Sequence, residues 1–188
     1  MAQYFLSKVE GEEAVRRWAD GGLRYTILRP CGFMSNWLAP WTSFQTPDLI
    51  SEGVWHTAFS SDFPMPLIDT EDVGRIAAVA MQDPEGWHGR EVELIAETLP
   101  LKEVIRLLSE VSGKQLRIHT YTEQEAEKLS KENPLVKGMM IRIKTDSLGG
   151  PPAKDLNLPF DLKTFRNYLD ENREVVLETY AKVNNQTL

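Results

Sequence analysis

Two side chains near the start of the sequence, Tyr4 and Lys8, have the types and the spacing that could carry out proton transfer. A helix advances 3.6 residues per turn, so residues four apart lie one above the other on the same face. An ammonium group one turn from a phenol favours the ionised phenol and can also hold a sugar hydroxyl. On a helix, this pair could therefore act as a proton donor and its electrostatic support.

The residues around this pair predict a helix followed by a buried strand. Residues 5–19 mix apolar and charged positions in the manner of an amphipathic helix, which Gly21 and Gly22 would end. Residues 25–28 form a short β-branched and aromatic run, which indicates a parallel strand buried on both faces. The loop after that strand would lie at the carboxyl end of the sheet, where open α/β sheets bind ligands.

Helix and strand patterns alternate along the rest of the chain, which predicts a three-layer α/β fold. Asp69 or Thr70 is a plausible N-cap, residues 144–155 form the clearest loop, and Asp161 could cap a last helix. Strands are expected at residues 53–59, 65–68, 91–95 and 116–121, and helices at 70–81, 99–111, 123–131, 134–143 and from 161 onward.

Composition narrows the function classes. The net charge of -7 and the pI near 5.1 argue against nucleic acid or an anionic membrane surface as a partner. The longest apolar runs are too short to cross a bilayer, and one cysteine cannot form an internal disulfide. We therefore expect a soluble, cytoplasmic protein.

Three stretches resemble the NmrA-like family of atypical short-chain dehydrogenases. They are Tyr4-x-x-x-Lys8, the run from Arg24 to Asn36 with its Ile27-Leu28-Arg29-Pro30-x-Gly32-Phe33 centre, and Pro66 to Gly74. The resemblance implies the later part of a Rossmann-like parallel sheet over residues 1–121, with excursions into the substrate region. It also implies a smaller, mainly helical substrate-binding region over residues 122–188.

The resemblance assigns roles to some residues. Lys8 matches the lysine that bonds the nicotinamide ribose, and Tyr4 matches the proton donor of the wider dehydrogenase class. The segment that would pack against the nicotinamide comprises Pro30, Cys31, Gly32 and Phe33. An ordinary strand-to-loop exit explains that segment equally well.

The other candidate site residues have simpler structural explanations. Met34, Trp37 and Trp41 could line a substrate pocket, although such side chains are more often plain core. Asp69 and Asp72 suit helix capping better than acid-base catalysis.

Cysteine and histidine chemistry is not expected. Cys31 has no histidine nearby in sequence and suits a buried or loop thiol better than a nucleophile. The three histidines are far apart in sequence and in unrelated patterns, so no metal site is predicted.

The glycine-rich loop that cradles a dinucleotide has no counterpart here, because Gly21 and Gly22 precede a strand and Gly149 and Gly150 precede two prolines. We therefore expect either the later portion of a longer protein or a natural short form. The first hypothesis is an NAD(P)-dependent oxidoreductase, using NADP or NAD, that acts on a small carbonyl or related apolar substrate. The alternative is a non-catalytic module that senses a dinucleotide or another ligand. Loss of the central strands would expose a sheet edge, so the isolated chain is expected to form a homodimer or to be marginally soluble.

Overall fold

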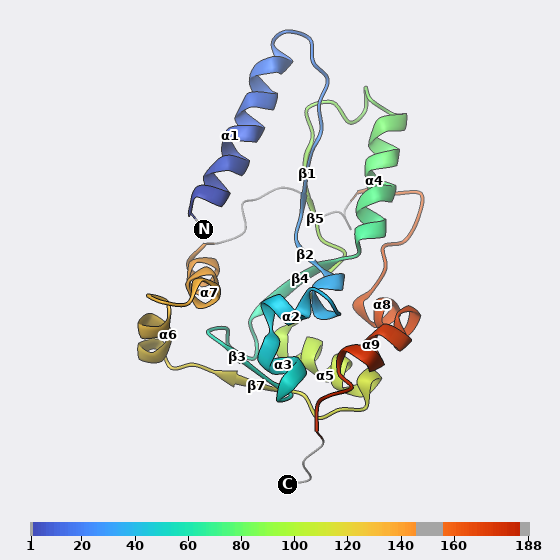
Figure 1. Ribbon diagram of the computed structural model, residues 1–188. Helices are drawn as coiled ribbons and strands as arrows, with labels where there is room; N and C mark the ends of the chain where they lie inside the picture. Colours follow the sequence, from blue (N-terminus) through green and yellow to red (C-terminus); the bar gives the residue numbers. More distant parts are fainter. Residues whose placement is uncertain (1, 146–155, 185–188) are drawn as a thin grey trace.

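The predicted three-layer arrangement is present around a parallel pair of strands, β1 (Ile27–Pro30) and β5 (Glu91–Leu94). The computed structural model describes residues 2–145 and 156–184, with side chains from residue 6 onward in the first range. Figure 1 shows α1 (Ala2–Ala19) on one side of this pair and α4 (Thr70–Gln82) on the other. The helix and strand order expected around the Tyr4 and Lys8 motif is therefore confirmed.

Both central strands continue into a second sheet. β1 is followed after Cys31 by β2 (Gly32–Phe33), which pairs in parallel with β4 (Pro64–Ile68). β4 pairs on its other edge with the antiparallel strand β6 (Glu97–Pro100). A separate parallel pair joins β3 (Val54–Thr57) to β7 (Arg117–Thr120).

Short helices connect and cover these sheets. None of the described helices is both long and apolar enough to span a membrane. The larger core cluster contains residues from α5, α8 and α9, so both sides of the expected boundary at residue 121 contribute to it. The division at that residue stays a prediction. The remaining helices are η1 (Met34–Trp37), α2 (Thr42–Gln45), α3 (Pro47–Ser51), α5 (Leu101–Ser112), α6 (Glu123–Leu129), α7 (Pro134–Lys144), α8 (Phe165–Glu171) and α9 (Arg173–Thr179).

Some sequence-based boundaries were wrong. The first strand begins at Ile27, because Tyr25 and Thr26 bond instead to the turn at residues 87–89: the Thr26 hydroxyl donates to the Trp87 carbonyl at 2.8 Å. The pattern before Pro100 did not reveal β6. Thr164, rather than Asp161, caps α8 by accepting from the Asn167 amide at 3.2 Å. Most of the expected loop at residues 144–155 lies outside the described residues.

Capping explains the acidic pair at the start of α4. The Asp69 carboxylate accepts from the Glu71 amide at 3.4 Å and pairs with the Lys163 ammonium at 2.8 Å. Asp72 is fully buried and accepts from the Lys163 backbone amide at 2.7 Å and from Arg75 at 3.0 Å. These contacts fasten the segment before α8 to α4.

We predict that Asp72→Ala destabilises the protein by about 3 kcal/mol, because it leaves a buried amide and an arginine without their acceptor. Asp62→Ala is the control, since the Asp62 carboxylate pairs with Lys102 at an exposed site and should cost less than about 1 kcal/mol. Urea unfolding measures the free energy of unfolding of both variants. Equal midpoints for the two variants would contradict the assignment.

A second prediction concerns the free edge of β1, which pairs within the described residues with β5 alone. Unpaired strand edges recruit other strands. We expect the isolated chain to dimerise through this strand or to be poorly soluble, as light scattering would show. A soluble chain that light scattering shows to be strictly monomeric would refute this association.

Candidate functional site

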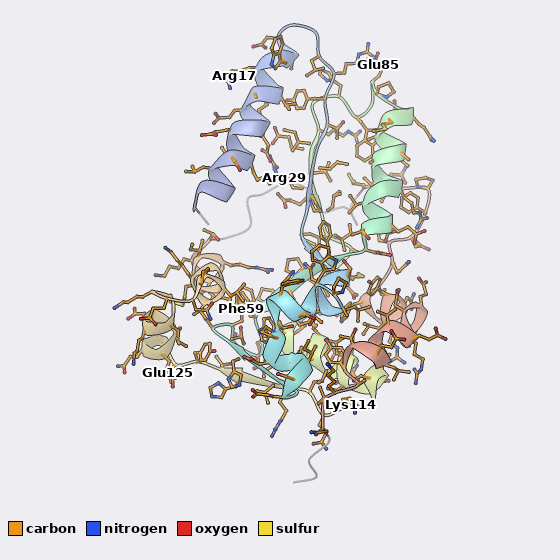
Figure 2. All side chains as sticks on the ribbon, viewed as in Figure 1. Arg17, Arg29, Phe59, Glu85, Lys114 and Glu125 are labelled. Atoms are coloured by element: carbon orange, nitrogen blue, oxygen red, sulfur yellow. The ribbon has the colours of Figure 1, made fainter. Side chains whose placement is uncertain are left out.

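A network of four charged side chains attaches α1, the helix of the Tyr4 and Lys8 motif, to the sheet. Arg16 on α1 donates to both oxygens of Glu91 on β5, with its Nε 2.6 Å from Oε1 and its second nitrogen 2.8 Å from Oε2. Arg29 on β1 donates twice to Glu12 on α1 at 2.8 Å and once to Glu91 at 2.5 Å. Figure 2 shows Arg29 between the helix and the strands. Each arginine thus bridges two carboxylates.

This network shifts the acidity of its carboxylates. Hydrogen bonds from Arg16 and Arg29 lower the pKa of Glu91 to about 2. The pKa of Glu12 is also lowered, chiefly by its hydrogen bond from Arg29. Glu93, next to the network on the same strand, behaves oppositely because burial raises its pKa. The two carboxylates that hold α1 are therefore ionised at neutral pH.

The amino-terminal half of α1 extends beyond this attachment. Every side chain from residue 6 to residue 11 is exposed, including Lys8. Leu6 and Trp18 are 59% and 71% exposed, so the helix presents apolar groups to its surroundings while charged groups face the sheet. Tyr4 lies on the same helix, and its side chain is outside the described part. The structure thus places Lys8 on an accessible helix face.

The carboxyl end of β1 is a second strand rather than the expected loop. Pro30 is exposed, the Cys31 amide donates to the Leu94 carbonyl at 3.3 Å, and Gly32 and Phe33 pair with β4. A Cβ at Gly32 would lie 3.0 Å from the Pro66 carbonyl oxygen, which explains the need for glycine at this close approach.

Burial raises the pKa of Cys31 to about 12, although the nearby positive charge of Arg142 acts in the opposite direction. The thiol therefore stays mostly protonated at neutral pH and is a poor nucleophile, which does not suit a catalytic role. This agrees with the simpler reading of Cys31 as a partly buried thiol.

The three proposed pocket residues are not brought together around one cavity. Met34 is fully buried, and Trp37 packs edge to face against Trp55 with ring centroids 5.3 Å apart in the main core. Trp41 is 55% exposed. In this structure Met34 and Trp37 serve the core, and a substrate contact for any of the three stays a prediction.

Two histidines that are distant in sequence meet on the β3 and β7 pair. His56 and His119 occupy equivalent positions on the two parallel strands, and their Nδ1 atoms are 3.3 Å apart. Their separation of 63 positions in the sequence gave no sign of this contact, because strand register is decided by tertiary pairing. No cluster of three or more metal-ligating side chains occurs within residues 6–145 and 156–184.

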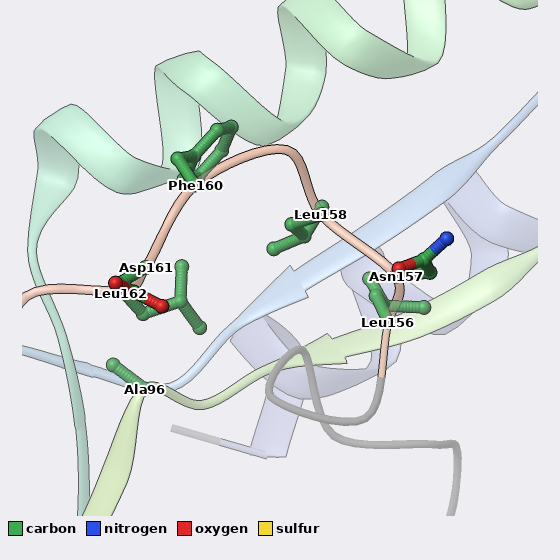
Figure 3. Close-up of a pocket in the computed structure, with 7 residues that line it drawn as sticks. All are labelled: Ala96, Leu156, Asn157, Leu158, Phe160, Asp161 and Leu162. Atoms are coloured by element: carbon green, nitrogen blue, oxygen red, sulfur yellow. The ribbon is translucent and has the colours of Figure 1, made fainter.

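A hollow of about 330 Å³ lies on the α4 side of the central strands (Figure 3). The segment at residues 156–162 forms most of its wall, and Phe160 from this wall packs against Arg75 of α4. Since Lys8 lies on α1, on the other side of the β1 and β5 pair, this hollow is separate from the Tyr4 and Lys8 motif. Its lining comprises Ala96, Leu156, Asn157, Leu158, Phe160, Asp161 and Leu162.

The fold is that of an α/β protein of the Rossmann-like class. Helices cover both faces of a parallel strand pair, and an ionised network holds the motif helix. The leucoanthocyanidin reductase of Vitis vinifera, solved as a binary complex with NADPH, has the same fold, with a TM-score of 0.65 and 17% identity over 90% of this chain and 59% of that one. A model of the NmrA-like family matches residues 1–146, so the chain belongs to that family.

Two curated relatives are similar over part of their length. One is the (4-alkanoyl-5-oxo-2,5-dihydrofuran-3-yl)methyl phosphate reductase of Streptomyces griseus, 35% identical over 57% of this chain and 35% of that protein. The other is the agroclavine dehydrogenase of Claviceps fusiformis, 28% identical over 83% of this chain and 56% of that protein. The chain therefore spans about a third and about half of these relatives.

The charge network predicts acid-sensitive docking of α1. The folded-state pKa of Glu91 is lowered from its ordinary value of 4.5 to about 2, so its contribution is complete above pH 4.5 and is lost as the pH falls toward 2. Glu91→Gln should remove most of this contribution and speed amide exchange in α1 at pH 7 about tenfold. Hydrogen exchange followed by NMR measures this directly.

The matched control is Glu103→Gln, because Glu103 also pairs with an arginine but lies on α5. It should leave exchange in α1 unchanged. Equal exchange in α1 for wild type and Glu91→Gln would show that the network does not hold the helix.

Proposed function

We propose that this chain is the substrate-side part of an NAD(P)-dependent oxidoreductase that acts on a small carbonyl, enone or related apolar compound. The observation that carries the proposal is the docking of α1 through Arg16, Glu12, Glu91 and Arg29. It attaches the helix that bears Lys8, through Glu12 and Arg16, to the strand whose end would meet a nicotinamide. The printed names of the two curated relatives, a reductase and a dehydrogenase, agree with this class.

The described residues fit only one end of a dinucleotide. Lys8, on an accessible face of α1, and the backbone at residues 30–33 would hold the nicotinamide and its ribose. The turns from β4 into α4, from β6 into α5 and from β7 into α6 contain no glycine, and the first places the buried Asp69 carboxylate at the helix start. Such turns suit neither the close approach nor the charge of a pyrophosphate.

Each residue of the motif has a role in this proposal. A reduced nicotinamide, when bound, supplies a hydride to the substrate carbon. The Tyr4 hydroxyl would donate the proton that the substrate oxygen needs. The Lys8 ammonium would hold the ribose and stabilise the phenolate that remains on Tyr4. Whether NADP or NAD serves would depend on residues that contact the adenosine end.

We predict that the 188-residue chain binds NADPH with a Kd above about 1 mM, because the phosphates lack a glycine-rich cradle. Isothermal titration calorimetry measures this value. A Kd near 1 μM, about -8 kcal/mol, would show that the dinucleotide is held elsewhere on the described surface.

The coding sequence upstream of Met1 tests the catalytic part of the proposal. A reading frame that continues into a strand, a Gly-x-x-Gly-x-x-Gly loop and a helix would give a protein expected to oxidise NADPH with carbonyl or enone substrates. In that protein Lys8→Met should lower kcat/KM about 100-fold, whereas Lys137→Met on the exposed face of α7 should not. Full activity of Lys8→Met would refute the assignment.

The second candidate function is ligand sensing without catalysis. The glycine-free turns described above favour it. A stop codon directly upstream of Met1, together with no NADPH oxidation by the expressed chain, would make it the better explanation.

A further inference from the structure

Arg142 is a partly buried arginine placed over two aromatic rings. Its guanidinium carbon lies 5.7 Å from the Phe59 ring centroid and 5.6 Å from that of Phe63. The two rings are themselves stacked, with centroids 4.3 Å apart. Arg142 projects from α7, and Phe59 follows β3 in the part of the molecule labelled in Figure 2. The rings support one face of a planar cation.

No carboxylate within the described residues pairs with Arg142, and its guanidinium donates none of the hydrogen bonds observed there. A guanidinium carries five N–H donors. Arg29, which is also partly buried, donates to both Glu12 and Glu91. Arg142 is therefore half-buried without the anionic partner that such a charge ordinarily has.

The guanidinium of Arg142 also reaches an opening. No fully enclosed side-chain nitrogen or oxygen in the described part lacks a hydrogen-bond partner. Since the Arg142 nitrogens make no hydrogen bond there, they must touch solvent. Burial of the rest of the group lowers the pKa of Arg142, so its surroundings oppose the charge instead of compensating it. An entering anion would supply that compensation.

Arg142 lies near the carboxyl end of β1. Its positive charge acts on the Cys31 thiol, and that residue directly follows β1. The amino-terminal end of α1, which bears Lys8, points toward the part of the molecule that contains α7 (Figure 1). An anion held by Arg142 would therefore lie beside the end of the strand where the proposed reaction takes place.

We propose that Arg142 binds an oxyanion of the substrate, a carboxylate or a phosphate monoester, while the half-buried Phe63 contacts the adjoining apolar part and the buried Phe59 supports Phe63 from the core. This inference rests on the proposed function, and it adds a charged substituent to the apolar substrate described there. The planar fork of an arginine binds both kinds of oxyanion through two parallel hydrogen bonds.

Cys31 is a built-in reporter, because it is the single cysteine of the chain. Iodoacetate carries a carboxylate, whereas iodoacetamide is neutral. With either reagent the Cys31 sulfur forms a bond to the CH2 carbon, iodide leaves, and the thiol proton passes to solvent. The ratio of the two alkylation rates isolates attraction of the anion, because any change in the thiol pKa affects both rates equally.

The expected result is that Arg142→Met lowers the iodoacetate to iodoacetamide ratio about tenfold, as the loss of one charge-assisted pair would. Arg142→Lys should keep part of the ratio, and Lys137→Met on the same helix should keep all of it. Intact mass spectrometry of the full chain gives both rates. Equal ratios for wild type and Arg142→Met would overturn the proposal.

A second measurement tests the site if alkylation is too slow to follow or if a variant misfolds. NMR titration of the wild-type chain with benzoate and with phenyl phosphate should move the amides around Phe59 and Arg142 saturably, and the stronger ligand identifies the oxyanion. Arg142→Lys should weaken this binding, and neutral benzamide should not bind. No saturable shift with either anion would refute the site. Neither experiment needs a dinucleotide or turnover, so its failure is distinct from failure of the proposed function.

Discussion

The attachment of α1 is electrostatic, and the rest of the proposed site depends on it. Arg16 and Arg29 each bridge two carboxylates, so the helix, β1 and β5 are joined by one continuous set of hydrogen-bonded charges. A single exposed ion pair contributes little, but bidentate geometry and shared partners make a network more effective. Lys8 lies one turn from Glu12 on the same helix, so the network places the part of the helix from which the Lys8 side chain projects.

This mode of docking distinguishes α1 from helices such as α5 and α8. α5 and α8 bury leucine and phenylalanine side chains in the core, whereas α1 contacts the strands through Arg16 and Glu12 and leaves Leu6, Val9 and Trp18 exposed. Three apolar side chains on one exposed helix are the composition expected of a surface that another segment or chain covers. The free edge of β1 lies beside that helix, so both features point to association at the same end of the molecule.

The arginines differ in the partners that their charges have. Arg29 satisfies its donors within the fold, and the Arg142 guanidinium is held by aromatic rings with its donors open to solvent. The first arrangement builds structure, because three hydrogen bonds already join Arg29 to two carboxylates. In the second arrangement, the Arg142 guanidinium can still bind an anion. Because the charge of Arg142 acts on Cys31, which follows β1, that anion would lie toward the end of β1.

Local patterns in the sequence determined much of the fold. The helix over residues 5–19, the glycines that follow it and the Asp69 cap depend on contacts within one or two turns, and each appears in the structure. The amphipathic pattern did not predict burial, since Leu6, Val9 and Trp18 are exposed. The start of β1 and the existence of β6 were missed because hydrogen bonds to residues 87–89 and pairing with β4 decide them.

Long-range partners decided the site. The sequence placed Tyr4 and Lys8 on a helix and pointed to the end of β1, since both follow from local spacing. It could not show that Glu91 would meet Arg16 across 75 positions, that His119 would lie beside His56, or that no carboxylate in residues 6–145 and 156–184 would pair with Arg142. Those facts are set by strand register and packing between distant segments, which only the tertiary structure defines.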